Sequence, residues 1–156
     1  MTGRRLTQSP GFPLSRSPST GPAVARRWAV AWGIFLLTLT SWPSPPSVPV
    51  VSGIPNFDKL VHFTLYAVEA WLLYRSVRWA GRTGFSAART LAIVGVMAVW
   101  GVADETHQTW IPRRSMEGAD VLADVAGAGV GAAVASWVSR GDRRSGSGTD
   151  PSLRSG

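Results

Sequence analysis

Four apolar segments, separated by polar or proline-rich stretches, constrain the fold of this chain more than any other feature. They occupy residues 28–42, 60–79, 90–103 and 119–138. A helix of about 20 apolar residues is about 30 Å long and can cross the hydrocarbon core of a bilayer. The second and fourth segments have that length, and the other two reach it with their flanking residues. The pattern predicts an all-α fold, an integral membrane bundle of four transmembrane helices.

The composition agrees with a membrane protein. Hydrophobic residues make up 45% of the 156 residues and charged residues only 16%, whereas soluble domains average about 25% charged residues. Many of the 8 Trp stand near the ends of apolar segments, as in the aromatic belts of membrane interfaces. The chain has no Cys, which excludes disulfides and thiolate metal sites.

The chain divides into one membrane domain and two tails. Residues 1–26 and 139–156 are rich in Ser and Gly and lack an apolar period, so we expect disordered cytoplasmic tails around a domain at 27–138. The pair Arg26 and Arg27 before a short apolar core also fits a signal peptide. No small-x-small cleavage site follows that core, and we therefore favour a retained helix.

Prolines set the expected helix limits. The proline-rich connector at 43–57 cannot be helical throughout, so the second helix should run over 58–79. The third should start near Arg89 and extend past Asp104, because the apolar segment alone is too short to span. Pro112 forbids its further continuation.

The cations indicate how the helices are oriented. Of the 16 cationic residues, 15 are Arg, and thirteen lie in the N-terminal tail, the 75–89 region and the C-terminal tail. Only Lys59, Arg113 and Arg114 lie on the other side. The positive-inside rule then places both termini in the cytoplasm. Because the cations cluster between apolar segments, they indicate membrane orientation and no nucleic-acid partner.

This topology gathers polar residues at the non-cytoplasmic membrane face. The stretch 104–124 holds five carboxylates, a His, a Gln and a pair of Arg. Charged groups this close to lipid cost free energy, so a chain that carries several usually uses them in its function. Residues four apart share one side of a helix. Three such pairs predict that three helix ends converge on one patch: Asp58 with His62, Asp104 with Gln108, and Asp120 with Asp124.

Two further positions continue these helix faces toward the membrane interior. On the last helix, Gly127 and Gly131 form a small-xxx-small pair that permits close helix packing, so this face should turn into the bundle. On the second helix, the polar stripe descends through Tyr66 to Glu69. At that depth the Glu69 carboxyl must find a partner or be protonated.

Three motifs together resemble the VanZ-like family, small multi-helix membrane proteins named after an accessory factor in teicoplanin (glycopeptide) resistance. The motifs are DKLVHFTLY (58–66), DETHQTWIPRRS (104–115) and DVLADVAGAGVG (120–131). The resemblance covers residues 27–138. It implies a cell-envelope role and, in some members, lowered glycopeptide susceptibility, with no agreed biochemical activity. It places family positions on Asp58, Lys59, His62, Asp104, Glu105, Gln108, Pro112, Arg114, Asp120 and Asp124, although members often have Asn at the last.

Two hypotheses of different class follow for the polar patch. In the first it is an enzyme site for a lipid-linked or phosphate-bearing envelope precursor, with a His and carboxylates as general acid and base. The catalytic candidates are then Asp58, His62, Asp104, Glu105, Gln108 and Asp120, and the substrate-binding candidates are Arg114, Lys59, Asp124 and Glu69. In the second, the patch binds a ligand or partner without chemistry.

Other interpretations remain open at this stage. The residues predict no defined metal site, although the carboxylates can hold Mg²⁺ or Ca²⁺ in either hypothesis. A proton-coupled carrier using Glu69 is disfavoured, because four short helices leave little room for alternating access. A purely structural alternative makes Asp58 and Asp120 stabilisers of helix N-termini and pairs Arg114 with Glu105 or Glu117 to fasten the loop.

Overall fold

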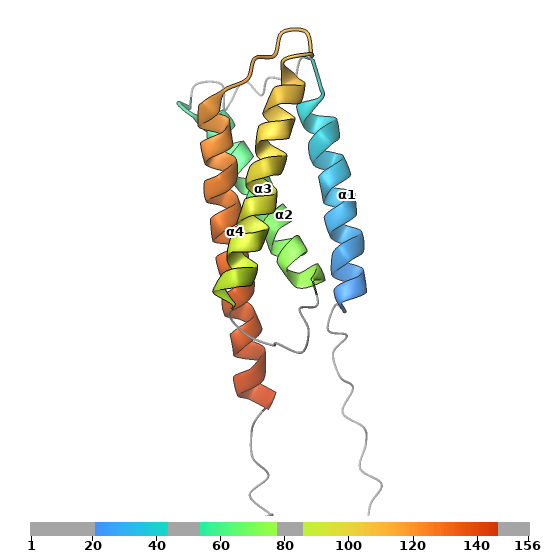
Figure 1. Ribbon diagram of the computed structural model, residues 1–156, viewed down its shortest axis with the longest axis vertical. Coiled ribbons are helices and arrows are strands. Elements are labelled where there is room, and N and C mark those ends of the chain that lie inside the picture. The colour runs from blue at the N-terminus through green and yellow to red at the C-terminus, as the bar shows by residue number, and fades with distance from the viewer. Residues whose placement is uncertain (1–20, 44–53, 78–85, 147–156) are drawn as a thin grey trace, which may run out of the picture.

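A computed structural model describes residues 21–43, 54–77 and 86–146, and the side chains of these residues up to 140. They form four helices, α1 (Pro22–Thr40), α2 (Phe57–Ser76), α3 (Ala87–Gln108) and α4 (Gly118–Gly146). Successive helices run in opposite directions, so the ends of α1 and α3 meet the starts of α2 and α4 at one end of the bundle (Figure 1). The predicted all-α fold is confirmed for the described residues.

Two helices extend into the segments expected to be disordered tails. α1 begins at Pro22 instead of Trp28, because proline fits the first turn of a helix, where its missing N–H has no acceptor. α4 continues past 138 to Gly146, since no proline interrupts the chain there. The remainder of both tails, most of the connector at 43–57 and the segment 78–85 lie outside the described residues.

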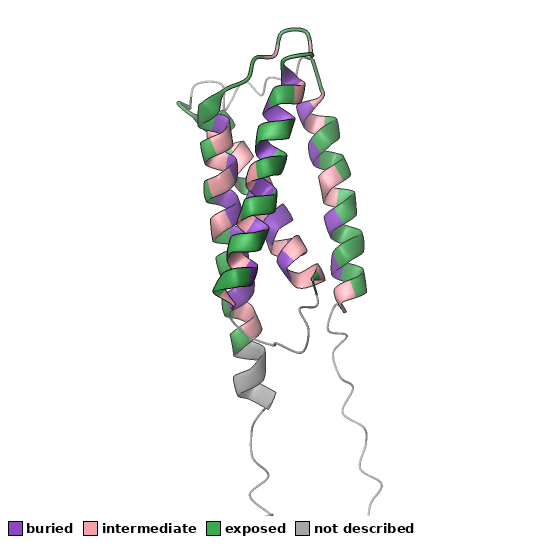
Figure 2. Cartoon of the chain, in the orientation of Figure 1, coloured by how far each residue is buried: buried purple, intermediate pink, exposed green. Residues whose placement is uncertain are grey.

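Among the described residues, three helices are long and apolar enough to cross a membrane: α1, α3 and the part of α4 up to Arg140. Their outward faces carry large apolar side chains, and Leu91, Val99 and Leu122 are each more than 70% exposed. Figure 2 shows such exposed faces along the outside of these helices, with buried residues turned inward. Apolar surface spread over several helices suits lipid contact and not water.

α2 differs from the three apolar helices because ionisable residues are spread along its length, from Asp58 to Arg75. It contacts each of the other described helices. Its closest partner is α4. A Cβ added to Gly127 would overlap the backbone carbonyl of Phe63, and one added to Gly131 would overlap that of Ala67. The predicted close packing at these two glycines is therefore confirmed. Below them the core is formed by Leu36, Tyr66, Ala70, Tyr74, Ile93, Met97, Ala128, Ala132 and Ala135.

α1 is attached to α2 by fewer contacts. The indole N–H of Trp32 donates to the carbonyl of Leu65 at 3.0 Å, and Leu36 is fully buried. At its last residue, Thr40, α1 also reaches the polar end of α3.

Candidate functional site

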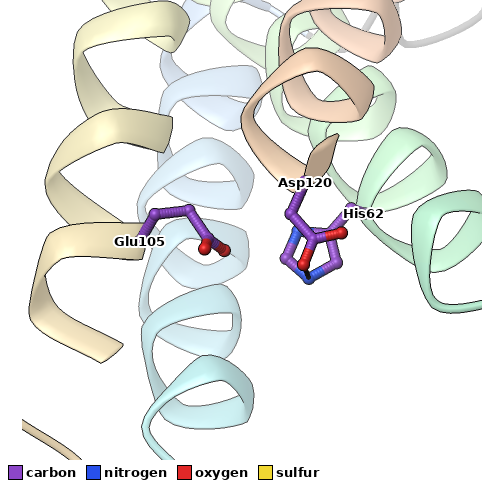
Figure 3. A group of neighbouring side chains, drawn as sticks. All are labelled: His62, Glu105 and Asp120. Carbon is purple, nitrogen blue, oxygen red and sulfur yellow. Dashed lines mark ion pairs between the residues drawn. The ribbon is translucent and has the colours of Figure 1, made fainter. Parts of the chain in front are cut away.

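The polar ends of α2, α3 and α4 meet at the end of the bundle where α3 ends and α4 begins. We call this set the polar cluster: Lys59, His62, Asp104, Glu105, Gln108, Asp120 and Asp124. Its four carboxylate residues are at most 7% exposed. The predicted convergence of three helix ends is thus observed, and Figure 3 shows Glu105 pointing from α3 toward His62 of α2 and Asp120 of α4.

His62 is oriented by a buried carboxylate. Its Nδ1 lies 3.0 Å from Oδ1 of Asp124, which is fully buried. A carboxylate only accepts hydrogen bonds, so Nδ1 carries a proton, and in the neutral ring the lone pair is on Nε2. Nε2 faces Oδ2 of Asp120 at 3.9 Å, which is too long for a direct hydrogen bond. The ring therefore presents Nε2 to the interior of the polar cluster.

Glu105 is held by two hydrogen bonds, one within α3 and one from the following loop. Its Oε1 accepts from the amide of Gln108 at 2.9 Å, and its Oε2 accepts from the backbone N–H of Glu117 at 2.8 Å. Gln108 shares one side of α3 with Asp104, as the spacing predicts, but its amide donates to Glu105, three residues before it. Both Glu105 and Gln108 are fixed in place.

Asp104 faces α1 instead. It accepts a hydrogen bond from the hydroxyl of Thr40 at 2.8 Å and one from Tyr66 at 3.3 Å. Neither partner was identified as a site residue from the sequence. Tyr66 could have been found, because it lies four residues after His62 on the polar stripe. Thr40 carries no such signal, because it lies at the end of an apolar segment that contains no ionisable residue.

Lys59 joins three carboxylates at the rim of the polar cluster. Its ammonium lies 2.7 Å from Asp58, 2.6 Å from Glu117 and 2.7 Å from Oδ1 of Asp120. The side chain of Asp58 is 58% exposed, so this catalytic candidate lies outside the buried part of the site. Lys59 thereby links the starts of α2 and α4 to the loop between α3 and α4.

Arg114 lies beside α1. Its Nη2 donates to the backbone carbonyl of Thr40 at 3.3 Å, and its Nε is buried without a hydrogen-bond partner in the described chain. Within the described residues it makes no ion pair with Glu105 or Glu117. Arg114 therefore fastens the loop to α1 through a backbone carbonyl and not through a carboxylate. It satisfies a carbonyl at the end of α1, where backbone oxygens lack helical partners.

Glu69, the last of the substrate-binding candidates, lies away from the polar cluster. It is 8% exposed, and a Cβ on Gly33 of α1 would lie 3.8 Å from its Oε1. Its Oε2 has no hydrogen-bond partner among the described residues. The structure therefore brings Glu69 to the α1–α2 interface and not to the site.

The polar cluster carries more negative than positive charge. Of its four buried carboxylates, Asp120 lies against the ammonium of Lys59 and Asp124 against the ring of His62. Asp104 and Glu105 accept hydrogen bonds from neutral groups instead. Oδ2 of Asp124 is buried and accepts no hydrogen bond in the described structure. A Cβ on Gly101 would lie only 3.0 Å from this oxygen, so glycine permits the carboxylate to approach α3. Buried charge of this kind is costly unless it is paired.

Two trios in the site have the residue types and spacing of a metal site. In each, one ligand atom per residue lies within 4.8 Å of the others. Asp58, Glu117 and Asp120 surround the ammonium of Lys59, which already supplies a positive charge. His62, Glu105 and Asp120 form the other trio (Figure 3). Asp104 and Asp124, which the sequence offered as oxygen ligands, belong to neither.

A comparison of the sequence with protein-family models identifies one family. The model of the VanZ/LLP1 family matches residues 15–139, which include every residue of the polar cluster. The chain belongs to the VanZ/LLP1 family. The resemblance drawn from the three motifs is confirmed, and with three apolar helices this VanZ/LLP1-family chain is a membrane protein. No curated protein and no solved structure matches it.

Proposed function

We propose that this VanZ/LLP1-family protein binds and acts on a lipid-linked, phosphate-bearing cell-envelope compound at the outer face of the cell membrane. One observation carries the proposal. His62 is held by buried Asp124 and presents Nε2 to Glu105 and Asp120, at the end of a bundle whose outer faces are apolar. A membrane-embedded bundle receives lipid-anchored molecules directly, and a reactive head group then lies at the depth of these side chains.

The outer location follows from the cations of the described chain. The end of the bundle opposite the polar cluster carries Arg26, Arg27, Arg75, Arg89 and Arg140. The end with the polar cluster carries Lys59, Arg113 and Arg114. Because cationic segments stay in the cytoplasm, we place both termini there. α2 then crosses the membrane as the fourth span of a multi-pass protein, with its ionisable residues shielded by the other helices.

The chemistry available to the site is proton transfer combined with anion binding. An imidazole whose Nδ1–H is fixed by a carboxylate can take up or donate a proton at Nε2. Arg114 retains a buried Nε donor directed at no described acceptor, and guanidinium binds phosphate through fixed N–H donors. The acidic surroundings repel a bare anion, so a cation has to accompany a phosphate into the site.

A second candidate is a scaffold in which the polar cluster only fastens the bundle. One observation favours it. Lys59 contacts three carboxylates, and Asp104 and Glu105 each accept two hydrogen bonds within the protein. Removing such partners destabilises the fold, whereas removing a reactive group abolishes only activity. The two candidates therefore predict different amounts of the variant proteins in the membrane: reduced amounts for a scaffold, and normal amounts for a reactive site.

The test compares His62→Gln and Asp124→Asn with Met116→Ala, a change in the exposed loop beside the site. Purified protein in nanodiscs is titrated with a polyprenyl phosphate and with the matching phosphate-free alcohol. We expect the wild type and Met116→Ala to prefer the phosphate, and the other two to lose that preference at normal membrane abundance. Degradation of both site variants alone would favour the scaffold, and unchanged binding would contradict the proposal.

Lowered teicoplanin susceptibility is a cellular consequence of the same proposal. Cells that express the wild-type protein should tolerate more teicoplanin than cells without it, because altering an envelope precursor changes the envelope material that the drug binds. This gain should disappear with His62→Gln and persist with Met116→Ala. The measurement is the minimal inhibitory concentration at matched protein levels.

A further inference from the structure

The interior of the polar cluster brings together three ligand-type atoms from three helices. A ring nitrogen of His62 on α2, a carboxylate oxygen of Glu105 on α3 and one of Asp120 on α4 lie within 4.8 Å of one another. Nε2 is the ring nitrogen that faces Asp120. Figure 3 shows the three side chains directed toward a common space. They are far apart in the sequence, so their meeting is a product of the fold.

Each of the three side chains is positioned from behind by another group. Asp124 holds Nδ1 of His62 at 3.0 Å, and Lys59 lies 2.7 Å from Oδ1 of Asp120. Glu105 accepts the hydrogen bonds of Gln108 and of the Glu117 backbone. Outer contacts of this kind, above all a carboxylate on the far nitrogen of a His, are characteristic of residues that bind a metal ion.

The electrostatics of this interior require a positive charge. With the ring neutral, the lone pair of Nε2 faces Oδ2 of Asp120 at 3.9 Å and the carboxylate of Glu105 nearby, and like charges repel. Asp124 adds a fully buried carboxylate whose Oδ2 accepts no hydrogen bond in the described structure. Lys59 compensates Asp120 from the rim but reaches neither Glu105 nor Asp124 among its described contacts.

We propose that His62, Glu105 and Asp120 bind one divalent transition-metal ion, with Zn²⁺ as the best fit, and that Asp124 is a positioning residue for the His62 ring. Imidazole nitrogen suits Zn²⁺, whereas Mg²⁺ and Ca²⁺ prefer oxygen ligands alone. Ligand atoms around a tetrahedral Zn²⁺ lie roughly 3.4 Å apart. Nε2 of His62 and Oδ2 of Asp120 are 3.9 Å apart, so metal binding requires the three side chains to move closer together.

This inference extends the proposed function by naming its cofactor, but it stands on geometry that does not depend on any substrate. Three protein ligands leave a fourth position for water or for an oxygen of the bound compound, as in catalytic zinc sites. If the proposed function holds, a phosphate oxygen takes this position. The ion would then also neutralise the carboxylates that otherwise repel a phosphate.

The test measures metal binding by the full chain in nanodiscs, after treatment with a chelator, by calorimetric titration with Zn²⁺ and elemental analysis. We expect one Zn²⁺ per wild-type chain, no stoichiometric binding in His62→Ala, and binding about 10–100-fold weaker in Asp124→Asn. His107→Ala removes the other histidine of the chain, and Met116→Ala changes an exposed loop residue beside the site. Both controls should bind as the wild type does.

A spectroscopic measurement avoids reliance on variants that fail to fold. Cu²⁺ bound to the wild-type protein should show imidazole nitrogen couplings by pulsed electron paramagnetic resonance, and His107→Ala should retain them. Absence of these couplings, their loss in His107→Ala, or equal Zn²⁺ binding in His62→Ala would overturn the metal site. Metal binding without any lipid preference would contradict the proposed function alone. Lipid preference in a wild-type protein that binds no Zn²⁺ would contradict the metal site alone.

Discussion

Two halves of the α2–α4 interface differ in what they join. In its middle, Gly127 and Gly131 bring the backbone of α4 against the carbonyls of Phe63 and Ala67. At its polar end, Asp120 and Asp124 of α4 meet side chains of α2, the ammonium of Lys59 and the ring of His62. One half is a contact between backbones, and the other is a contact between charged groups.

The two halves depend on each other. His62 directly precedes Phe63, and Asp124 lies three residues before Gly127. The close approach at Gly127 therefore fixes the distance between His62 and Asp124. The glycine half of the interface supplies the position of the site, and the charged half supplies its chemistry. Changes to the first should act on the fold, and changes to the second should act on the fold only where a buried partner is lost.

The largest effect is expected in the glycine half. Gly131→Val places side-chain atoms on the backbone of α2, which cannot yield without separating the helices, and should lower the free energy of unfolding by about 3 kcal/mol or more. Gly129→Ala is the control, because a Cβ at Gly129 meets nothing within 4 Å. Unfolding in mixed micelles by added SDS measures both. A tolerated Gly131→Val would show that α2 and α4 are not held in backbone contact.

Next to the charged half, two glutamates distinguish a buried contact from an exposed one: Glu105 of α3 and Glu117 of the loop before α4. Glu105→Ala leaves the buried amide of Gln108 and the N–H of Glu117 without an acceptor and should lower the free energy of unfolding by about 2 kcal/mol or more. Glu117→Ala removes an ion pair of a half-exposed side chain, which contributes about 0–1 kcal/mol. SDS titration in the presence of a chelator isolates these contacts from metal binding. Equal losses for the two variants would contradict the account of Glu105.

A smaller effect distinguishes two buried tyrosines of α2. Tyr66 donates to Asp104, whereas the hydroxyl of Tyr74 has no hydrogen-bond partner in the described structure. Tyr66→Phe should lower the free energy of unfolding by about 0.5–1.5 kcal/mol, and Tyr74→Phe should leave it unchanged or raise it. A greater loss for Tyr74→Phe would mean that its hydroxyl has an acceptor, such as bound water.

The comparison of the two halves also shows how far a sequence can be interpreted without a structure. The glycine pair and the convergence of polar helix ends were predictable, because both follow from residue spacing along single helices. The pairing of His62 with Asp124 was not predictable, since Asp120 lies on the same side of α4. Which carboxylate the ring meets depends on the rotation of α2 relative to α4.

The remaining site contacts were hidden for the same reason. Asp104 could have met Gln108 on its own helix, but its rotation turns it toward Thr40 and Tyr66. The sequence offered Arg114 as a substrate-binding candidate or as a partner of Glu105 or Glu117, yet the loop leads it to the end of α1. Such contacts join separate helices and loops, and residue spacing along one helix does not predict them.

The central claim is that the polar cluster opens on the outer face of the membrane, where envelope compounds are found. Because the chain has no Cys, single cysteines can be labelled without background. Ser115→Cys lies in the exposed loop beside the cluster, and Ala87→Cys lies exposed at the opposite end of the bundle. A membrane-impermeant maleimide applied to intact cells should label Ser115→Cys, and Ala87→Cys only after permeabilisation. The reverse pattern would place the cluster in the cytoplasm and contradict the account.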